Sequence, residues 1–209
     1  MALTIYGSAT SRTSWVLWLA EELGLAYEHV AVNHRAGESR KPEHLALNPN
    51  GHVPVIRDDD LVLWESLAIN LYLAKKHGGP IAPQTPEDEA RSLMWSMWAL
   101  SELESRWAVL LQHSIMLPED KRNPALAADA RQALKAPLDV LEGALARSDC
   151  LLGEAFTVAD LNVASHIAML LRMKYDLAPW PKISAWLTKC TDRPAAARVR
   201  EMTAAAARR

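Results

Sequence analysis

The spacing of apolar residues changes near residue 80 of this 209-residue chain, and that change constrains the fold more than any other feature. Before it, short runs typical of strands alternate with helical runs; after it, every periodic stretch is helical. The strand-like runs are 3–6, 27–32, 53–56 and 61–64, and the longer helical runs are 14–23 and 65–78. The order β-α-β and then β-β-α predicts a mixed sheet, because strand–helix–strand units pair in parallel and hairpins pair antiparallel.

This element order is the pattern of a thioredoxin-like α/β domain, which we place at residues 1–79. Residues 80–90 are rich in proline and are interpreted as a linker. An all-α helical-bundle domain is then predicted over residues 91–209.

Three long helices are predicted within the second half, at 86–117, 124–147 and 156–171. The residues expected to share a buried face of the first are Leu93, Met97, Leu100, Trp107 and Leu111. Pro137 lies inside the second helix and should bend it. At the start of the third, Thr157 followed by Asp160 predicts a variant capping box, a structural role that needs no catalysis.

Charge and cysteine content exclude several classes of protein. The net charge of −2 argues against nucleic acid or an acidic membrane surface as partner. No apolar run is long enough for a membrane span, and the N-terminus lacks the pattern of a signal peptide. Cys150 and Cys190 are the only cysteines, so neither a disulfide framework nor a thiolate zinc site is expected. We expect a cytoplasmic protein without a metal.

The segment "NPNGHVPVI" (48–56) places a proline inside a predicted strand. Pro54 cannot donate a ladder hydrogen bond, which is unfavourable in a central strand. Two interpretations remain open from this segment alone. Pro54 either follows a cis peptide bond, which proline adopts at a cost of only about 0.5–1 kcal/mol, or lies in trans on an edge strand.

Four segments together resemble the cytosolic glutathione S-transferase family, in its bacterial serine/threonine-type form. They are "YGSATSRTSWVLWLAEELGLAYE" (6–28), "LNPNGHVPVI" (47–56), "LWESLAINLYLAKKHG" (63–78) and "LLGEAFTVADLN" (151–162). The resemblance implies glutathione as co-substrate, an electrophilic and largely apolar small molecule as acceptor, and a homodimer.

The resemblance also implies the residues that bind glutathione. A cis bond before Pro54 would turn the backbone of Val53 outward to pair with the cysteinyl part of the tripeptide. Ser66 begins a helix, where it would hold the γ-glutamyl carboxylate, and Glu65 would hold the ammonium group. His52 corresponds to the site for the glycyl end. The alternatives are an N-cap role for Ser66, a first-turn acid for Glu65 and a solvated loop histidine.

The group that activates the thiol is ambiguous, because residues 8–14 carry several hydroxyls. Counting back from "ELG" (22–24), the family's catalytic serine falls on Thr10, with Ser11 beside it. We rank Thr10 before Ser11. Tyr6 resembles the catalytic residue of tyrosine-type classes but comes early in the motif, so we expect it in the core.

Three tryptophans in the helical half are candidates for an apolar acceptor pocket: Trp95, Trp98 and Trp107. Ordinary core packing or a dimer interface explains the same spacing. Three functions therefore stay open. The first is a glutathione transferase, the second a glutathione-dependent disulfide or peroxide reductase, and the third a non-catalytic ligand-binding module.

Overall fold

The computed structural model describes residues 3–208 of the chain. Their contacts divide them into two compact units: unit 1 comprises the described residues up to Pro83 and from Asp192 onward, and unit 2 comprises Gln84–Thr191. The C-terminal helix thus packs with unit 1, which differs from the helical domain predicted over 91–209. Helix α4 begins at Pro86, so the predicted linker over 80–90 is also shorter than expected.

Unit 1 is a four-stranded mixed sheet with helices, as predicted. Its strands have the order β2-β1-β3-β4, with β1 parallel to β2 and antiparallel to β3. The strands are β1 (Leu3–Tyr6), β2 (Tyr27–Val30), β3 (Val55–Asp58) and β4 (Leu61–Trp64). The helices are α1 (Thr13–Glu22), α2 (Pro42–Leu45), α3 (Ser66–His77) and α10 (Pro194–Ala207).

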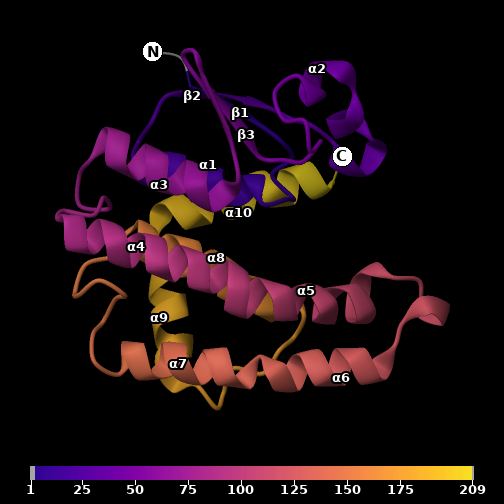
Figure 1. Ribbon diagram of the computed structural model, residues 1–209, viewed down its shortest axis with the longest axis vertical. Helices are drawn as coiled ribbons and strands as arrows, with labels where there is room; N and C mark the ends of the chain where they lie inside the picture. Colours follow the sequence, from indigo (N-terminus) through magenta and orange to yellow (C-terminus); the bar gives the residue numbers. More distant parts are fainter. Residues whose placement is uncertain (1–2, 209) are drawn as a thin grey trace. The chain divides into compact units, whose positions relative to one another are not determined.

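The core of unit 1 lies between the sheet and the pair α1 and α3, which pack against each other (Figure 1). Ile5 and Ile56 are directly opposite each other on β1 and β3, and both are fully buried. Leu17 of α1 and Ile69 of α3 are also fully buried. Alternation along the strands leaves Tyr6 on the other face of the sheet, where it lines a cavity together with residues of α2.

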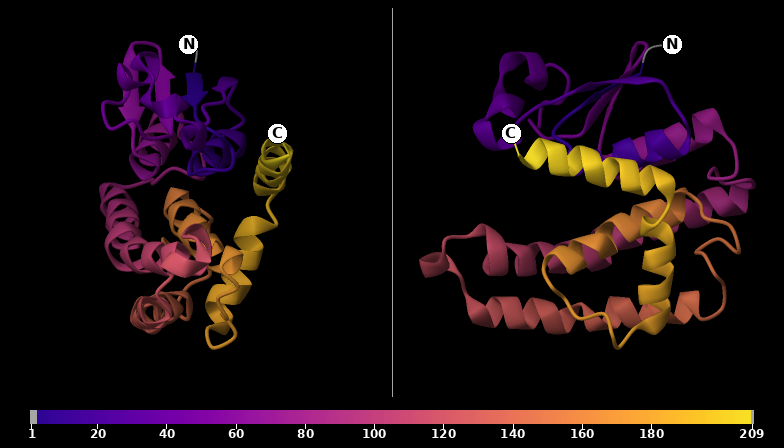
Figure 2. Two further views of the ribbon diagram at one scale, coloured as in Figure 1. Left: turned by 90° about the vertical axis from the view of Figure 1, so that its right-hand side faces the viewer. Right: turned by 180° about the vertical axis from the view of Figure 1, so that it is seen from behind.

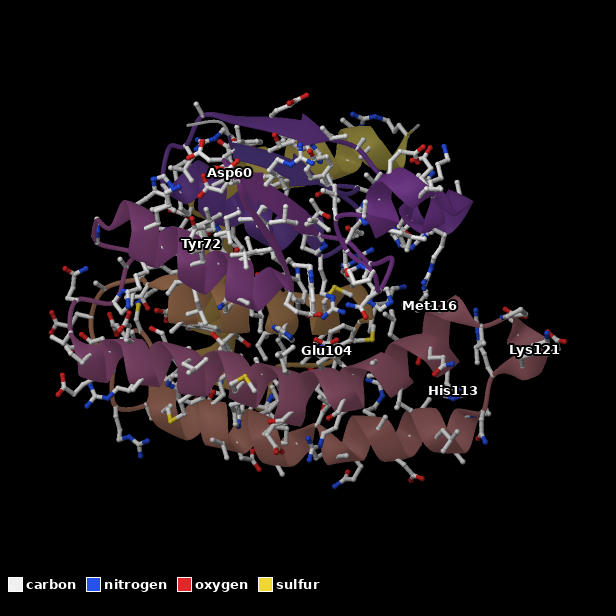
Figure 3. The ribbon with its side chains drawn as sticks, turned by 45° about the horizontal axis from the view of Figure 1, so that its top comes forward. Asp60, Tyr72, Glu104, His113, Met116 and Lys121 are labelled. Carbon is white, nitrogen blue, oxygen red and sulfur yellow. The ribbon has the colours of Figure 1, made fainter. Side chains whose placement is uncertain are left out.

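A buried ion pair joins the end of β3 to α3. Asp58 accepts hydrogen bonds from Lys76 at 2.5 Å and from the Tyr72 hydroxyl at 2.8 Å. Burial raises the pKa of Asp58, but the Lys76 ammonium and the Tyr72 hydroxyl outweigh it and hold that pKa below its usual value. Tyr72 lies on α3, as Figure 3 shows. This pair ties α3, which begins at Ser66, to the strand that follows Pro54.

Unit 2 is helical (Figure 2), and α4 and α9 pack against its buried helix α8. They are α4 (Pro86–Trp98), α5 (Ser105–Leu111), α6 (Pro124–Ala133), α7 (Lys135–Leu145), α8 (Val158–Arg172) and α9 (Pro181–Thr191). None of the helices within residues 3–208 has the length and hydropathy needed to cross a membrane.

The helix predicted over 86–117 contains two π-helical segments, Ala99–Glu104 and Gln112–Met116. The predicted buried face is wrong at its start, since Leu93 and Met97, which precede both π-helical segments, are exposed. The residues of α4 that are buried are Ser92, Trp95 and Ser96. Ser96 accepts a hydrogen bond from Asn162 of α8 at 2.9 Å, so small polar residues, and not the leucine stripe, face the core. A wider π turn then shifts the register of every residue after it.

The helix predicted over 124–147 is interrupted at Leu134, where α6 ends and α7 begins. Pro137 causes the interruption, because it has no N–H to donate to the carbonyl of Ala133 four residues earlier. The prediction was a bend within one helix; the structure instead divides the segment into two helices.

Candidate active site

The loop before β3 leaves one backbone edge open. The Val53–Pro54 peptide bond is cis, as the resemblance implied. The His52 carbonyl oxygen accepts hydrogen bonds from the His44 ring at 2.9 Å and from the Asn48 side chain at 3.0 Å, and these two bonds fix the loop in place. Among residues 3–208, no group pairs with the Val53 N–H or C=O. A peptide ligand can therefore pair with both, as one strand pairs with another.

The start of α3 contributes an anion site to the same place. Ser66 is the first residue of α3 and is buried, and its hydroxyl has no hydrogen-bond partner within the described residues. Unpaired N–H groups and the helix dipole favour a carboxylate there. Glu65 precedes it with φ 74°, a conformation that non-glycine residues rarely adopt and that concentrates at functional sites.

All five residues predicted to bind glutathione line one small pocket of unit 1. The pocket is lined by Arg12, Asn48, His52, Val53, Pro54, Glu65 and Ser66. Arg12 and Asn48 were not among the predicted site residues. Asn48 belongs to the quoted segment "LNPNGHVPVI" and Arg12 to the quoted segment over 6–28, so the motifs contained a signal for both.

Gly7 lets the hydroxyl-rich segment approach this pocket. Its φ is 137°, and a Cβ placed there would lie 2.0 Å from the Thr13 Oγ1 and 3.0 Å from the Val53 Cβ. Only glycine permits so close an approach of the β1 end, the α1 start and the Val53 loop. Neither Thr10 nor Ser11 lines the pocket itself, but Arg12, which directly follows Ser11, does.

Hydrogen bonds distinguish the two candidate hydroxyls. The Ser11 hydroxyl donates its one proton to the Ser8 carbonyl oxygen at 2.7 Å, and its oxygen accepts the Thr13 amide at 3.2 Å. Within residues 3–208, the one side-chain hydrogen bond of the Thr10 hydroxyl is to the Ser8 hydroxyl, at 2.9 Å, where either oxygen can be the donor. With Ser8 as donor, the Thr10 proton is available to a ligand. The Ser11 hydroxyl thus already donates its proton within the turn before α1, whereas the Thr10 hydroxyl can donate its proton to a ligand.

The three tryptophans of the predicted acceptor pocket have different surroundings. Trp95 and Trp98 contact edge to face with ring centroids 5.1 Å apart. Trp107 is buried and lies 6.2 Å from the ring of His166, whose Nε2 is 3.3 Å from the Glu104 carboxylate. Trp107 therefore belongs to the core of unit 2, and Trp98 is the most accessible of the three.

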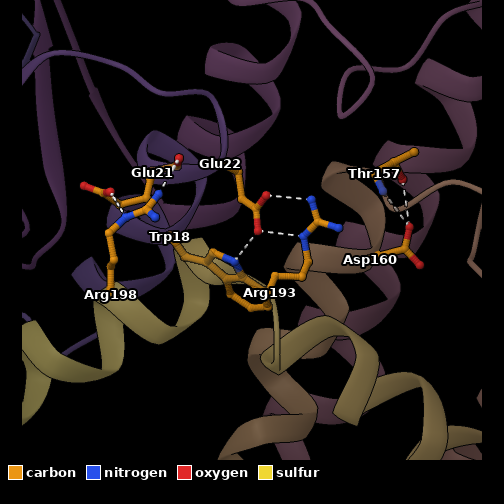
Figure 4. A network of polar contacts seen from close by, with 7 residues as sticks. All are labelled: Trp18, Glu21, Glu22, Thr157, Asp160, Arg193 and Arg198. Atoms are coloured by element: carbon orange, nitrogen blue, oxygen red, sulfur yellow. Dashed lines mark hydrogen bonds and ion pairs between the residues drawn. The ribbon is translucent and has the colours of Figure 1, made fainter.

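The predicted capping box is present at the start of α8 (Figure 4). Asp160 accepts hydrogen bonds at 2.9 Å from both the amide and the hydroxyl of Thr157. It also accepts the Leu151 amide at 2.9 Å and the Trp186 indole N–H at 3.0 Å. Burial raises the pKa of Asp160, and these four donors oppose that rise. Asp160 joins the start of α8 to the loop at Leu151 and to α9, and has a structural role.

Comparison with known proteins agrees with this geometry. The family model for the N-terminal domain of glutathione S-transferase matches residues 1–75, and that for the C-terminal domain matches residues 107–194. The chain is 32% identical to glutathione S-transferase GstB of Escherichia coli over 201 residues, which cover 94% of this chain and 97% of GstB. The chain belongs to the glutathione S-transferase family.

Two further comparisons support the assignment of this chain to the glutathione S-transferase family. It is 34% identical to glutathione S-transferase 4 of Zea mays over 208 residues, which cover 95% of this chain and 92% of the maize protein. The crystal structure of the theta class glutathione S-transferase from Xanthomonas axonopodis pv. citri, with glutathione bound, superposes with a TM-score of 0.87. That pair is 34% identical and covers 94% and 95% of the two chains. The protein is a transferase that conjugates glutathione.

Proposed function

We propose that this glutathione S-transferase adds the glutathione thiolate to electrophilic, largely apolar small molecules, with Thr10 as the residue that activates the thiol. The observation that carries the proposal is the open backbone of Val53 in one pocket with Glu65 and Ser66. The pocket offers a peptide-pairing edge, a carboxylate for an ammonium group and a helix start for a carboxylate. Glutathione carries the complementary groups, which are a peptide backbone, an ammonium group and a carboxylate.

The binding roles follow from this complementarity. The γ-glutamyl carboxylate binds the hydroxyl and amide of Ser66, and its ammonium group binds Glu65. The cysteinyl N–H and C=O pair with Val53, next to Pro54. His52 lies at the glycyl end.

The thiol of glutathione must lose its proton, because the thiolate is the nucleophile. A free thiol has a pKa of about 8.5, and lowering it by about 2 units requires about 2.7 kcal/mol of preferential stabilisation of the anion. A charge-assisted hydrogen bond contributes roughly 1.5–3 kcal/mol, and the N-terminus of α1 adds a favourable dipole. One O–H donor from Thr10 at the start of α1 is therefore sufficient. The thiol proton passes to solvent, because the Thr10 hydroxyl acts as a donor. With an aryl halide the thiolate forms the C–S bond and halide leaves, whereas with an isothiocyanate it adds to the central carbon and the nitrogen takes up a proton from water.

The acceptor is proposed to contact the aromatic residues of unit 2, among which Trp98 is the most exposed. The Trp95 ring packs edge to face against the Trp98 ring. Trp107 is buried, so it affects acceptor binding only indirectly, through the packing of α5 against α8. Contact with indole rings would favour aryl and alkyl electrophiles over polar ones.

Steady-state assays with two classes of substrate, electrophiles and reducible compounds, test this function. We expect glutathione-dependent turnover of an aryl halide and an isothiocyanate to exceed turnover of a small disulfide or a peroxide at the same glutathione concentration. Faster disulfide or peroxide reduction would assign the reductase function instead. If the protein is retained on a glutathione column but turns over neither class of substrate, the function is that of a non-catalytic ligand-binding module.

A homodimer is part of the proposal, and α4 supplies a candidate surface. Its apolar residues Leu93, Met94 and Met97 are 53%, 54% and 57% exposed, and together they form a patch on one helix. Patches of this kind mark protein–protein contacts. We expect Met97→Lys to convert a dimer to a monomer in light scattering at micromolar concentration.

Val140→Lys provides the control for this substitution, because Val140 is similarly exposed at 55% but lies on α7. The control should stay dimeric. A wild-type monomer, or equal loss of the dimer in both variants, would contradict the assignment of the α4 surface.

A further inference from the structure

Helix α10 is held against α1 by two arginine–glutamate pairs, although about 170 residues separate the partners in sequence. Arg193 donates two hydrogen bonds of 2.7 Å to Glu22, and Arg198 donates one of 2.6 Å to Glu21 (Figure 4). The Trp18 indole N–H donates to Glu22 at 3.0 Å. Two parallel N–H···O bonds fix orientation as well as distance.

Glu21 extends the connection to the sheet, because it also accepts the Tyr27 hydroxyl of β2 at 2.7 Å. The side chain of Glu22 is only 7% exposed, so its pair with Arg193 is shielded from solvent on the carboxylate side. Exposed ion pairs contribute little, whereas shielded bidentate pairs define geometry. Helix α10 therefore has a fixed position within unit 1.

From this position α10 contacts the loop that carries Thr10. The Thr203 hydroxyl lies 3.0 Å from the carbonyl oxygen of Ala9 and 2.9 Å from that of Val199, so its proton is shared between them. Ala9 is buried, at 2% exposure. Its carbonyl belongs to the same peptide plane as the N–H of Thr10.

The other side of that plane is also held. The Thr10 N–H donates to the Ser8 hydroxyl at 3.2 Å, and the same hydroxyl contacts the Thr10 Oγ1 at 2.9 Å. The Ala9–Thr10 peptide is thus fixed at its oxygen by Thr203 and at its nitrogen by Ser8. A rotation of this plane would carry the Thr10 side chain with it.

We propose that Thr203 is a positioning residue for glutathione activation: through the Ala9 carbonyl it fixes the direction in which the Thr10 hydroxyl points. This inference rests on the proposed role of Thr10. The α1–α10 ion pairs are the support from which Thr203 acts, so the C-terminal helix belongs functionally to the thiol site. Small displacements of a catalytic group cost large factors in rate.

The test compares Thr203→Val with Thr203→Ser and with Thr188→Val. Valine removes the hydroxyl at nearly constant shape, and serine restores it. Thr188 makes the same bond to the residue four before it, the Ser184 carbonyl at 2.9 Å, but lies on α9. The readouts are the thiol pKa of bound glutathione, from thiolate absorbance against pH, and kcat and KM for an aryl halide.

We expect Thr203→Val to raise the bound thiol pKa by about half a unit and to lower kcat about fivefold, with KM for glutathione within about twofold. Thr203→Ser should restore both values, and Thr188→Val should match the wild type. An unchanged thiol pKa in folded Thr203→Val, with Thr10→Val shifting it strongly, would overturn the role of Thr203 alone. An unchanged thiol pKa in Thr10→Val would instead overturn the proposed role of Thr10.

Discussion

Replacing Thr10 by valine should lower kcat/KM for glutathione conjugation about a hundredfold, when it is assayed below the thiol pKa of both proteins. Valine keeps the shape of threonine but cannot donate a hydrogen bond to the sulfur. The bound thiol then returns toward its free pKa of about 8.5, and the fraction of thiolate falls. Because only ionisation is lost, the defect should shrink as pH rises from about 6.5 to about 8.5, and it should be nearly absent above about 9. The measurement is the pH profile of kcat/KM with an aryl halide.

Ser11→Ala is the matched control, since Ser11 is the neighbouring hydroxyl. Its oxygen accepts the Thr13 amide at 3.2 Å, so its loss should reduce stability by about 1 kcal/mol. We expect its kcat/KM to stay within about threefold of the wild type. A hundredfold loss in Ser11→Ala together with a near-normal Thr10→Val would reverse the assignment.

Replacing Asp160 by alanine should lower the free energy of unfolding by about 3–5 kcal/mol. The carboxylate is fully buried, and its removal leaves the Leu151 and Thr157 amides and the Trp186 indole N–H without their acceptor. Those donors come from the loop before α8, from its first turn and from α9. Urea unfolding at neutral pH, followed by circular dichroism, measures the loss.

An exposed aspartate gives the comparison for Asp160. Asp149 is 73% exposed and contacts Lys189 at 3.4 Å, and Asp149→Ala should change the free energy of unfolding by less than about 1 kcal/mol. A loss below about 1 kcal/mol in Asp160→Ala would show that the four hydrogen bonds do not stabilise unit 2.

The features predicted correctly from sequence are those that depend on local chemistry. The order of strands and helices follows from apolar periodicity, and the capping box follows from the three-residue spacing of Thr157 and Asp160. Each of these signals lies within a few residues of its effect.

The features missed depend on partners far apart in the chain. Nothing near Arg193 indicates that it binds Glu22, so the C-terminal helix was assigned to the helical half. The π-helical turn at Ala99–Glu104 changes the register without a proline or glycine to mark it. In the sequence, Thr10 ranks before Ser11 only by its place in the motif, and the hydrogen bonds that distinguish the two hydroxyls exist only in the folded turn.

A crystal structure of the protein with reduced glutathione tests the central proposal most directly. We predict the cysteinyl backbone paired with the N–H and C=O of Val53, and the sulfur within hydrogen-bond reach of the Thr10 oxygen, at about 3.3 Å. Sulfur on the Ser11 oxygen instead, or a tripeptide bound away from the Val53 edge, would contradict it.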